Sequence, residues 1–234
     1  MADAWFPRRS ELDVADRDSV RRAVDAYRPD RVLHCAAFTD VVAAQTRRAD
    51  CWRTNVDGTR HLVEALESMA RPFRLLLVSS ACVFSGEDPS PCTEDDLPAP
   101  KNFYGLTKLL SEFVVQRCRD HLVVRTNFVP ESAWPHARAF TDRFGTYLYS
   151  ADVAAALVEL LAGPLQGLVH VVGDRRMSLM ELALRMTPGV PPMTLQDMPD
   201  VPLTRDMSLA SVRWPARQLG WVAAKHNGST PGWG

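Results

Sequence analysis

The sequence has 234 residues, of which 46% are hydrophobic, and its formal net charge at pH 7 is −1. This length and hydrophobic content suit one large domain, or a domain with a small lobe, built on a substantial core. Because the charge is balanced, with no basic stripe and no acidic tail, we expect neither nucleic acid nor a membrane surface as a partner.

The amino terminus lacks the long apolar region of a signal peptide, and the apolar runs are too short to span a bilayer. The five cysteines show no C-x-x-C spacing, which is typical of reduced structural thiols rather than of a metal site. We therefore expect a cytoplasmic protein without a membrane-spanning segment and without a bound metal ion.

Strands and helices alternate along the first third of the chain. Short apolar runs bounded by turn signals are typical of buried parallel strands. They predict strands at residues 12–14, 31–37 and 73–80. Periodic apolar residues after the capping residue Asp16 predict a helix. Helices are expected at residues 19–27, in a polar stretch that ends near residue 55, and at residues 57–68.

The second part of the chain continues the pattern after a loop over residues 85–103. This loop is rich in proline and is longer than most connections in a compact domain, which is typical of a functional segment. Further strands are predicted at residues 121–125 and 168–172. Further helices are predicted at residues 104–119, 152–161 and 209–219, and after Ser178. Residues 126–150 and 187–202 are expected to be irregular.

The alternation of strands and helices predicts an α/β fold with a parallel sheet. In such a sheet, ligands bind beyond the carboxyl ends of the strands. Three of the predicted strands end at residues 36–37, 79–80 and 125–126. Candidate chemistry therefore collects at one edge of the sheet.

Tyr104 and Lys108 are four residues apart, so they lie on one face of the predicted helix, one turn apart. An ammonium near a phenol favours the phenolate and lowers the pKa of the tyrosine from about 10. Such a tyrosine can exchange a proton with a substrate oxygen near neutral pH. The Y-x-x-x-K spacing also arises by chance, so the pattern alone leaves open a pair of surface residues.

Eight segments in order along the chain, together with Tyr104 and Lys108, give the sequence a resemblance to the extended short-chain dehydrogenase/reductases. It is most similar to the branch of dTDP-4-dehydrorhamnose reductases and related sugar-nucleotide-binding proteins. The segments are residues 12–16, 34–39, 55–59, 78–86, 125–128, 149–154, 167–173 and 205–209. The asparagine of the third segment, Asn55, resembles the one that supports the active site in this family.

The resemblance implies NAD(P)-dependent reduction of a nucleotide-activated 4-keto sugar by hydride transfer. Tyr104 is then the proton donor to the developing alkoxide, and Ser80 donates a hydrogen bond to the carbonyl oxygen. Lys108 lowers the pKa of Tyr104 and holds the nicotinamide ribose. These three residues form the expected catalytic set.

On the cofactor side, the resemblance implies contacts with NADP or NAD from Asp13, Ala36 and Ala37, in addition to Tyr104 and Lys108. Asp13 lies in the segment that contacts the adenine in this family. Ala36 and Ala37 lie in the turn beside the cofactor.

On the substrate side, the resemblance implies Cys82, Asn127, Arg125 and Arg205 as residues that bind a sugar nucleotide. The two arginines are expected near the sugar diphosphate, because a guanidinium pairs well with phosphate oxygens. Ordinary ion pairs remain an alternative for the arginines. For Cys82, the favoured alternative to a reactive thiol is a buried structural cysteine.

The expected glycine-rich turn is missing from the beginning of the sequence. A dinucleotide-binding unit begins with a strand, a G-x-G-x-x-G turn and a helix, yet the first glycine here is Gly58. The expected fold is therefore an N-terminally truncated, doubly wound Rossmann-like sheet with a small C-terminal substrate lobe. Residues 1–125 and 145–172 are assigned to the cofactor domain, residues 126–144 and 173–226 to the lobe, and residues 227–234 to a disordered tail.

Without a preceding strand, residues 32–35 are expected at the edge of the sheet, where unpaired backbone groups need cover. Residues 1–11, in particular Trp5 and Phe6, or another chain could provide it. Three interpretations remain open. The chain is a reductase that retains its chemistry, or a non-catalytic remnant that binds a sugar nucleotide or another protein, for example as a homodimer through this edge. In the third, the start is misplaced or the chain truncated, and the missing unit lies upstream.

Overall fold

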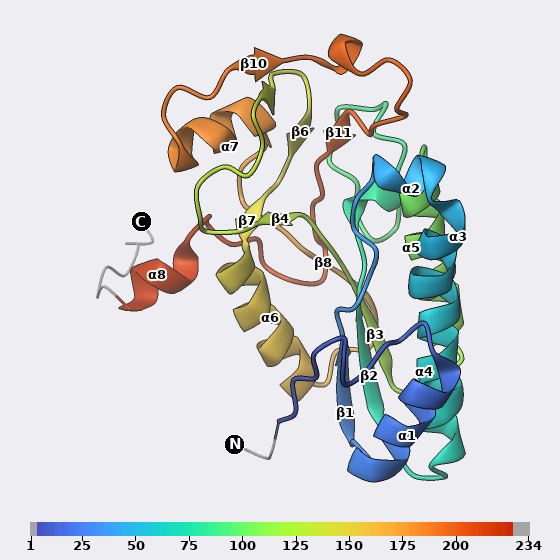
Figure 1. The fold of residues 1–234 in the computed structure, drawn as a ribbon. Coiled ribbons are helices and arrows are strands. Elements are labelled where there is room, and N and C mark those ends of the chain that lie inside the picture. The colour runs from blue at the N-terminus through green and yellow to red at the C-terminus, as the bar shows by residue number, and fades with distance from the viewer. Residues whose placement is uncertain (1–3, 227–234) are drawn as a thin grey trace.

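The computed structural model describes residues 4–226 and shows three layers, with a parallel sheet between two layers of helices (Figure 1). The sheet order is β1-β2-β3-β8, and all three neighbouring pairs are parallel. The strands are β1 (Arg31–His34), β2 (Arg74–Val78), β3 (His121–Thr126) and β8 (Gly167–Val171). The predicted α/β class with a parallel sheet is confirmed.

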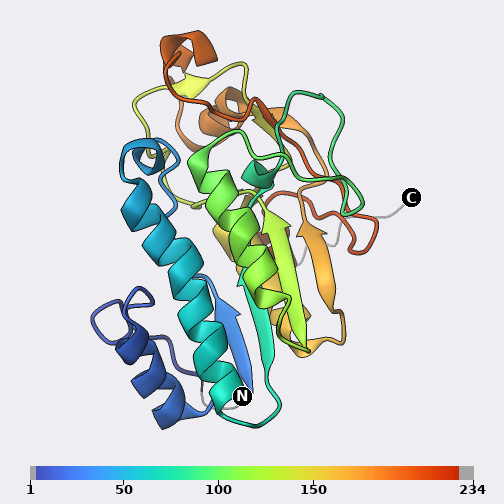
Figure 2. The same cartoon turned by 90° about the vertical axis from the view of Figure 1, so that its right-hand side faces the viewer.

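Both faces of the sheet are covered by helices, and Figure 2 shows the helices of one face in front of the strands. The helices on one face are α1 (Arg17–Tyr27), α4 (Gly58–Ser68) and α5 (Phe103–Val115), and the other face carries α6 (Ser150–Ala162). Leu75 and Leu77 of β2 pack toward the first group, whereas Leu76 packs toward α6. Successive side chains of a strand point to opposite faces, so a strand covered on both sides is a continuous apolar run.

Helix α1 begins as the sequence predicts. The side chain of its N-cap residue, Asp16, accepts hydrogen bonds from the backbone N–H groups of Asp18 and Ser19, at 2.9 and 3.2 Å. The helix ends at Arg28, whose φ of 44° places it in the left-handed region. The two hydrogen bonds to Asp16 satisfy backbone amides of the first turn that have no partner within the helix.

Replacement of Asp16 by alanine is expected to lower the free energy of unfolding by about 1 kcal/mol, because two helix amides lose their acceptor. Urea unfolding followed by circular dichroism measures this loss. The matched control is Asp25→Ala in the same helix. In the described structure, the one polar contact of the Asp25 side chain is an exposed ion pair with Arg21 at 3.8 Å, so we expect its loss to cost less than about 0.5 kcal/mol. Equal losses in both variants would contradict a capping role.

Strand β1 lies at the end of the sheet, as predicted for residues 32–35. Within residues 4–226, β1 pairs along one side only, with β2. The predicted cover by Phe6 is wrong, because this side chain is 85% exposed. Trp5 instead stacks on Tyr27 at the end of α1, with ring centroids 3.8 Å apart.

The short strand predicted at residues 12–14 is also wrong. These residues are irregular, and no strand pairs with them in the described structure. Leu12 and Val14 still pack into the core beside α1 and α4. Their apolar character therefore reflects burial between helices rather than a place in the sheet.

The polar stretch before α4 forms α2 (Ala43–Thr46) and α3 (Arg48–Trp52), followed by a π-helical turn over Arg53–Asp57. This turn joins α3 to α4 without a break in the helix. A single π turn inserted in an α-helix is rare and is frequently found at functional sites.

Short strands and one further helix lie beyond the carboxyl edge of the sheet (upper part of Figure 1). They are β4 (Phe128–Val129), β5 (Ala139–Phe140), β6 (Phe144–Gly145), β7 (Leu148–Tyr149), β9 (Met177–Ser178), α7 (Leu179–Met186), β10 (Pro192–Met193), a 3₁₀ turn (Leu195–Asp197) and β11 (Asp206–Met207). They fall largely in the segments predicted for the substrate lobe. The division into two domains stays a prediction.

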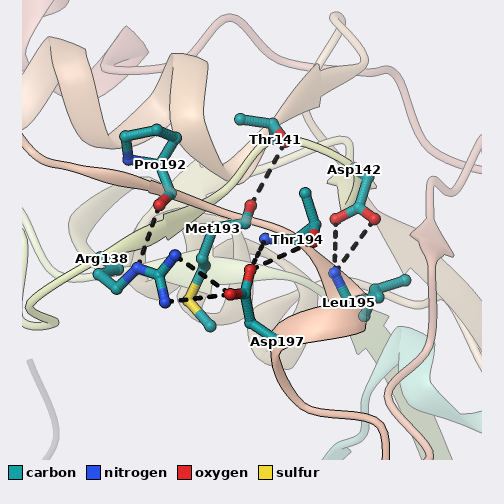
Figure 3. Close-up of polar contacts among 8 residues, drawn as sticks. All are labelled: Arg138, Thr141, Asp142, Pro192, Met193, Thr194, Leu195 and Asp197. Carbon is teal, nitrogen blue, oxygen red and sulfur yellow. Dashed lines mark hydrogen bonds and ion pairs between the residues drawn. The ribbon is translucent and has the colours of Figure 1, made fainter.

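Polar contacts fix the outer part of these segments (Figure 3). Arg138 donates to the carbonyl of Pro192 at 3.1 Å and forms an ion pair with Asp197 at 3.3 Å. The backbone N–H of Leu195 donates to the Asp142 carboxylate. Residues near 140 and near 195, far apart in the sequence, are therefore tied together.

The long loop over residues 85–102 is anchored by Glu94. Its carboxylate accepts hydrogen bonds from the backbone N–H groups of His170 and Val212, at 2.7 and 3.0 Å, and from the Ser211 hydroxyl. These hydrogen bonds lower the pKa of Glu94, although its partial burial acts in the opposite direction. The loop is thus held against β8 and the C-terminal segment.

The short helix predicted at residues 209–219 is wrong. The segment is irregular, with single bridge pairings of Leu209 to Cys92 and of Arg217 to Gly173. Pro215 interrupts the helical pattern, as expected for a residue without a backbone N–H. The last described helix is α8 (Trp221–His226). Residues 227–234, predicted to be a disordered tail, lie outside the described residues. Within residues 4–226, no helix combines the length and apolarity needed to cross a bilayer.

Candidate active site at the carboxyl edge of the sheet

The serine of the predicted set follows directly from strand β2. After Val78 the chain continues through Ser79 and Ser80 into a 3₁₀ turn over Ala81–Val83. Ser80 caps this turn, because its Oγ accepts a hydrogen bond from the backbone N–H of Cys82 at 3.1 Å. Ser80 is 9% exposed. It lies at the carboxyl edge of the sheet, where ligands of parallel α/β proteins bind.

Helix α5 brings Tyr104 and Lys108 to the same place. Both are buried on the face of α5 that packs toward the sheet. The Ser80 hydroxyl lies near enough to the Tyr104 phenol to act on its pKa. The Lys108 Nζ donates to the carbonyl oxygen of Val78 at 2.8 Å. The structure therefore brings the three predicted catalytic residues together.

Gly105 allows this close approach. A side-chain carbon at this position would overlap the backbone carbonyl of Cys82, because the first turn of α5 lies directly on the 3₁₀ turn. The backbone N–H of Gly105 donates to Oδ1 of the N-cap residue Asn102 at 2.8 Å. Only a glycine fits here without moving the helix.

The predicted influence of Lys108 on Tyr104 is wrong in this structure. Burial raises the pKa of the Tyr104 phenol, and the polar Ser80 side chain opposes that rise only in part. Burial also lowers the pKa of Lys108 to about 8, against the opposing charge of Glu112. Desolvation dominates both groups because it disfavours whichever form carries charge.

Asn55 supports the site from the π-helical turn. Its Oδ1 accepts from the backbone N–H of Phe38 at 2.7 Å, and its Nδ2 donates to Oγ1 of Thr107 at 2.9 Å. Thr107 lies between Tyr104 and Lys108 on α5. One amide side chain therefore joins the loop after β1 to the helix that carries the phenol and the ammonium.

Arg125 is not available to a substrate diphosphate. The side chain is 5% exposed and forms an ion pair with Glu112, with the Nη2–Oε2 distance at 2.7 Å. Its guanidinium also lies over the Phe84 ring, 5.0 Å from the centroid. The prediction fails because Arg125 lies inside the carboxyl end of β3, where a charge needs a buried partner. Glu112 was missed, although its spacing of four residues from Lys108 could have indicated it.

Cys82 and Asn127 both contact Met207 of β11. The Cys82 Sγ lies 3.8 Å from the Met207 Sδ, and Nδ2 of Asn127 donates to the Met207 carbonyl. Both residues are buried, and burial raises the pKa of the Cys82 thiol. The raised pKa fits a structural cysteine rather than a nucleophile.

Arg205 is exposed and lines a cavity of about 290 Å³ beside β11. The other lining residues are Gly86, Glu87, Pro89, Phe144, Arg176 and Asp206. Arg176 pairs with Asp206 at 2.7 Å and covers the Phe144 ring, so Arg205 is the cation of this cavity whose charge is not matched by an ion pair in the described structure.

The three residues predicted for the cofactor lie on two segments. Ala36 is exposed and Ala37 is half-buried in the turn after β1. The Asp13 carboxylate is engaged locally, since it accepts from the backbone N–H of Ala15 at 3.0 Å and lies 3.5 Å from an Arg9 nitrogen.

A larger cavity, of about 890 Å³, lies at the opposite edge of the sheet. Arg31 and Arg74, at the amino ends of β1 and β2, are among the residues that line it. None of the predicted site residues lies there. Within residues 4–226, no group of three or more His, Cys, Asp or Glu side chains is arranged to hold a metal ion.

A parallel α/β sheet with a buried serine, tyrosine and lysine at its carboxyl edge defines a Rossmann-like protein of the short-chain dehydrogenase/reductase class. More specifically, the chain belongs to the family described as "RmlD substrate binding domain", whose model matches residues 2–190.

Two relatives illustrate the range of the family. The chain is 30% identical to the spore coat polysaccharide biosynthesis protein SpsK of Bacillus subtilis, over 74% of this chain and 65% of that protein. It is 33% identical to a dTDP-4-dehydrorhamnose reductase of Streptomyces griseus, over 68% of this chain and 57% of that protein. The matched region thus spans less than two thirds of each relative.

The fold has a solved counterpart. The crystal structure of dTDP-4-dehydrorhamnose reductase from Bacillus anthracis, in complex with NADP, superposes with a TM-score of 0.80. The match covers 97% of this chain and 84% of that chain, at 22% sequence identity. At this identity the similarity establishes the fold.

Proposed function

We propose that this chain is an NAD(P)-dependent reductase of a nucleotide-activated 4-keto sugar, similar in activity to the dTDP-4-dehydrorhamnose reductases. The observation that carries the proposal is the grouping of three buried side chains, those of Ser80, Tyr104 and Lys108. It lies at the edge of the sheet where ligands bind, in a chain that belongs to this family.

The residues fit the nicotinamide-ribose end of the cofactor. The Lys108 ammonium donates one of its three protons to the Val78 carbonyl. The other two would donate to ribose hydroxyls. Cys35 and Ala36 are exposed after the end of β1, and the Cys35 thiol and the Lys108 ammonium interact electrostatically. For the pyrophosphate end, residues 1–57 contain no glycine-rich turn.

In the proposed reaction, Tyr104 donates its phenolic proton to the carbonyl oxygen of the sugar as this oxygen gains negative charge. The raised pKa of Tyr104 keeps the phenol protonated at neutral pH, which is the form a proton donor requires. Ser80 stabilises the same oxygen by a hydrogen bond. The bound nicotinamide supplies the hydride.

Arg205 is the proposed contact for the diphosphate of the sugar nucleotide, because its guanidinium is exposed in the cavity beside β11. Asn127 and Cys82 would shape the sugar pocket through Met207. Arg125 has no direct part in this assignment.

The Tyr104→Phe variant is expected to bind NADPH like the parent protein and to lose at least about 100-fold in kcat, because the proton donor is removed. Fluorescence titration with NADPH and NADH, and turnover of a dTDP-4-keto sugar, measure the two effects. Tyr27→Phe is the matched control, since Tyr27 is 55% exposed on α1 and stacks on Trp5. Failure of the parent chain to bind either cofactor at millimolar concentration would exclude catalysis by this chain alone.

The second candidate is a non-catalytic protein of the same family that binds a sugar nucleotide or pairs with another copy through β1. It is favoured by the free edge of β1 in the described structure. Binding of dTDP without binding of NADPH, in a protein that sediments as a dimer, would support it.

A further inference from the structure

Glu112 is a buried carboxylate beside the candidate site, and the proposed reaction leaves it without a role. It is 4% exposed on α5. One oxygen accepts hydrogen bonds from the Ser79 hydroxyl and from Nε of Arg125, the latter at 3.0 Å. The other accepts from Nη2 of Arg125 at 2.7 Å. A carboxylate so far from water needs partners of this kind.

Glu112 and Lys108 hold consecutive residues of the same strand end. Lys108 donates to the carbonyl of Val78, and the Glu112 carboxylate accepts from the Ser79 hydroxyl. Ser80 is the next residue along the chain. Two charged side chains, one helical turn apart on α5, therefore fix the backbone that leads into the serine.

Glu112 is also the anionic neighbour of Lys108. The other titratable groups that interact with Lys108 in the described structure are His34, Cys35 and Cys51. Desolvation raises the pKa of both thiols, and burial lowers the pKa of His34 to about 3. These shifts favour the neutral form of all three groups. Among these groups, the Glu112 carboxylate is the one that most opposes the desolvation of the Lys108 ammonium.

We propose that Glu112 is a positioning residue, which keeps the Lys108 ammonium charged inside the site and holds the end of β2 at Ser79 against α5. Its effect on catalysis rests on the reductase function proposed above. Its effect on Lys108 does not, because it concerns only side chains of this chain.

The alternative is a purely structural role, in which Glu112 serves only to neutralise Arg125. The two roles predict opposite changes in Lys108. Loss of the carboxylate charge lowers the pKa of Lys108 below about 8. Loosening of the packing admits water and raises that pKa toward 10.5.

The experiment is a pH titration of isotopically labelled lysine side chains by NMR. The sequence contains only Lys101, Lys108 and Lys225, so Lys101→Arg and Lys225→Arg variants assign the signals. Glu112→Gln is expected to lower the pKa of Lys108 by about 1 unit. An unchanged or raised value would overturn the proposal.

Two further variants complete the test. Glu67→Gln is the matched control, because Glu67 forms an exposed pair with Arg117 at 2.9 Å, and it is expected to leave Lys108 unchanged. Glu112→Gln could leave Arg125 as a buried charge without a partner and prevent folding. The double variant Glu112→Gln/Arg125→Met removes both charges and is expected to show the same fall in the pKa of Lys108.

The titration also separates this proposal from the proposed function. A protein that fails to bind NADPH but shows the expected fall at Lys108 contradicts the reductase alone. If the parent chain reduces a keto sugar, Glu112→Gln is expected to move the alkaline limb of the kcat/KM profile to lower pH, whereas Glu67→Gln leaves that limb in place.

Discussion

Raising the pH from 7 to 10.5 is expected to stabilise the parent protein by about 3 kcal/mol relative to its Lys108→Met variant. The reason is the burial of Lys108, which lowers its pKa from 10.5 to about 8 in the folded protein. Methionine has a similar length and no charge, so the variant lacks this dependence on pH.

The sign follows from proton binding. Below about pH 8, Lys108 is protonated in both the folded and the unfolded chain, and the cost of burying the charge is fully present. Between about 8 and 10.5, the unfolded chain keeps a proton that the folded chain has released, so the free energy of unfolding rises with pH. The gain is complete above 10.5.

Urea unfolding of both proteins at a series of pH values measures the effect. Other titrations in this range, such as those of the buried thiols and phenols, cancel in the comparison. Lys101→Met serves as the control, because Lys101 forms a partly exposed pair with Glu87 at 3.3 Å, and its difference from the parent is expected to stay flat. A flat difference for Lys108→Met as well would show that Lys108 is solvated in the folded protein.

Replacement of Gly105 by alanine is expected to lower the free energy of unfolding by about 3 kcal/mol, because the added methyl group would overlap the Cys82 carbonyl. Neither side of this contact can move easily, because the added methyl group is fixed to the helix backbone and the Cys82 carbonyl is a backbone group. The first turn of α5 would have to move away from the 3₁₀ turn over Ala81–Val83, and the Tyr104 phenol would then move away from Ser80.

The matched control is Gly163→Ala at the end of α6. Gly163 has a φ of −84°, which alanine tolerates, and the nearest atom to an added methyl group is the Glu159 carbonyl oxygen at 3.3 Å. This substitution is expected to change stability by less than about 1 kcal/mol. Equal stability of Gly105→Ala and the parent would show that α5 is able to shift at little cost.

The parts of the fold that follow from local patterns could be predicted from the sequence. Apolar runs bounded by turns identified β1, β2, β3 and β8, and the capping residue Asp16 identified the start of α1. Spacing placed Tyr104 and Lys108 on one helix face, and the family resemblance added Ser80 to them. These features need only a few neighbouring residues to specify them.

The errors concern contacts between distant segments. Residues 12–14 have the composition of a strand but pack between helices, and residues 209–219 have a helical pattern but make single pairings with Cys92 and Gly173. Arg125 was predicted to meet a ligand, yet it meets Glu112, which lies on another element. The sequence does not indicate whether a buried arginine pairs with a ligand or with a carboxylate on another element. The pKa of Tyr104 was predicted in the wrong direction for the same reason, because the extent of burial is a property of the whole fold.

The π-helical turn at Arg53–Asp57 sets the rotation of one helix relative to the next. One residue of an α-helix corresponds to a rotation of about 100°. The wider turn thus offsets the face of α3, which carries Cys51, from the face of α4 that packs on the core. It also leaves the Asn55 carbonyl able to accept from the hydroxyls of Thr59 and Ser111, at 2.6 and 2.8 Å. The orientation of Asn55 toward α5 therefore depends on the number of residues in this turn as much as on their chemical type.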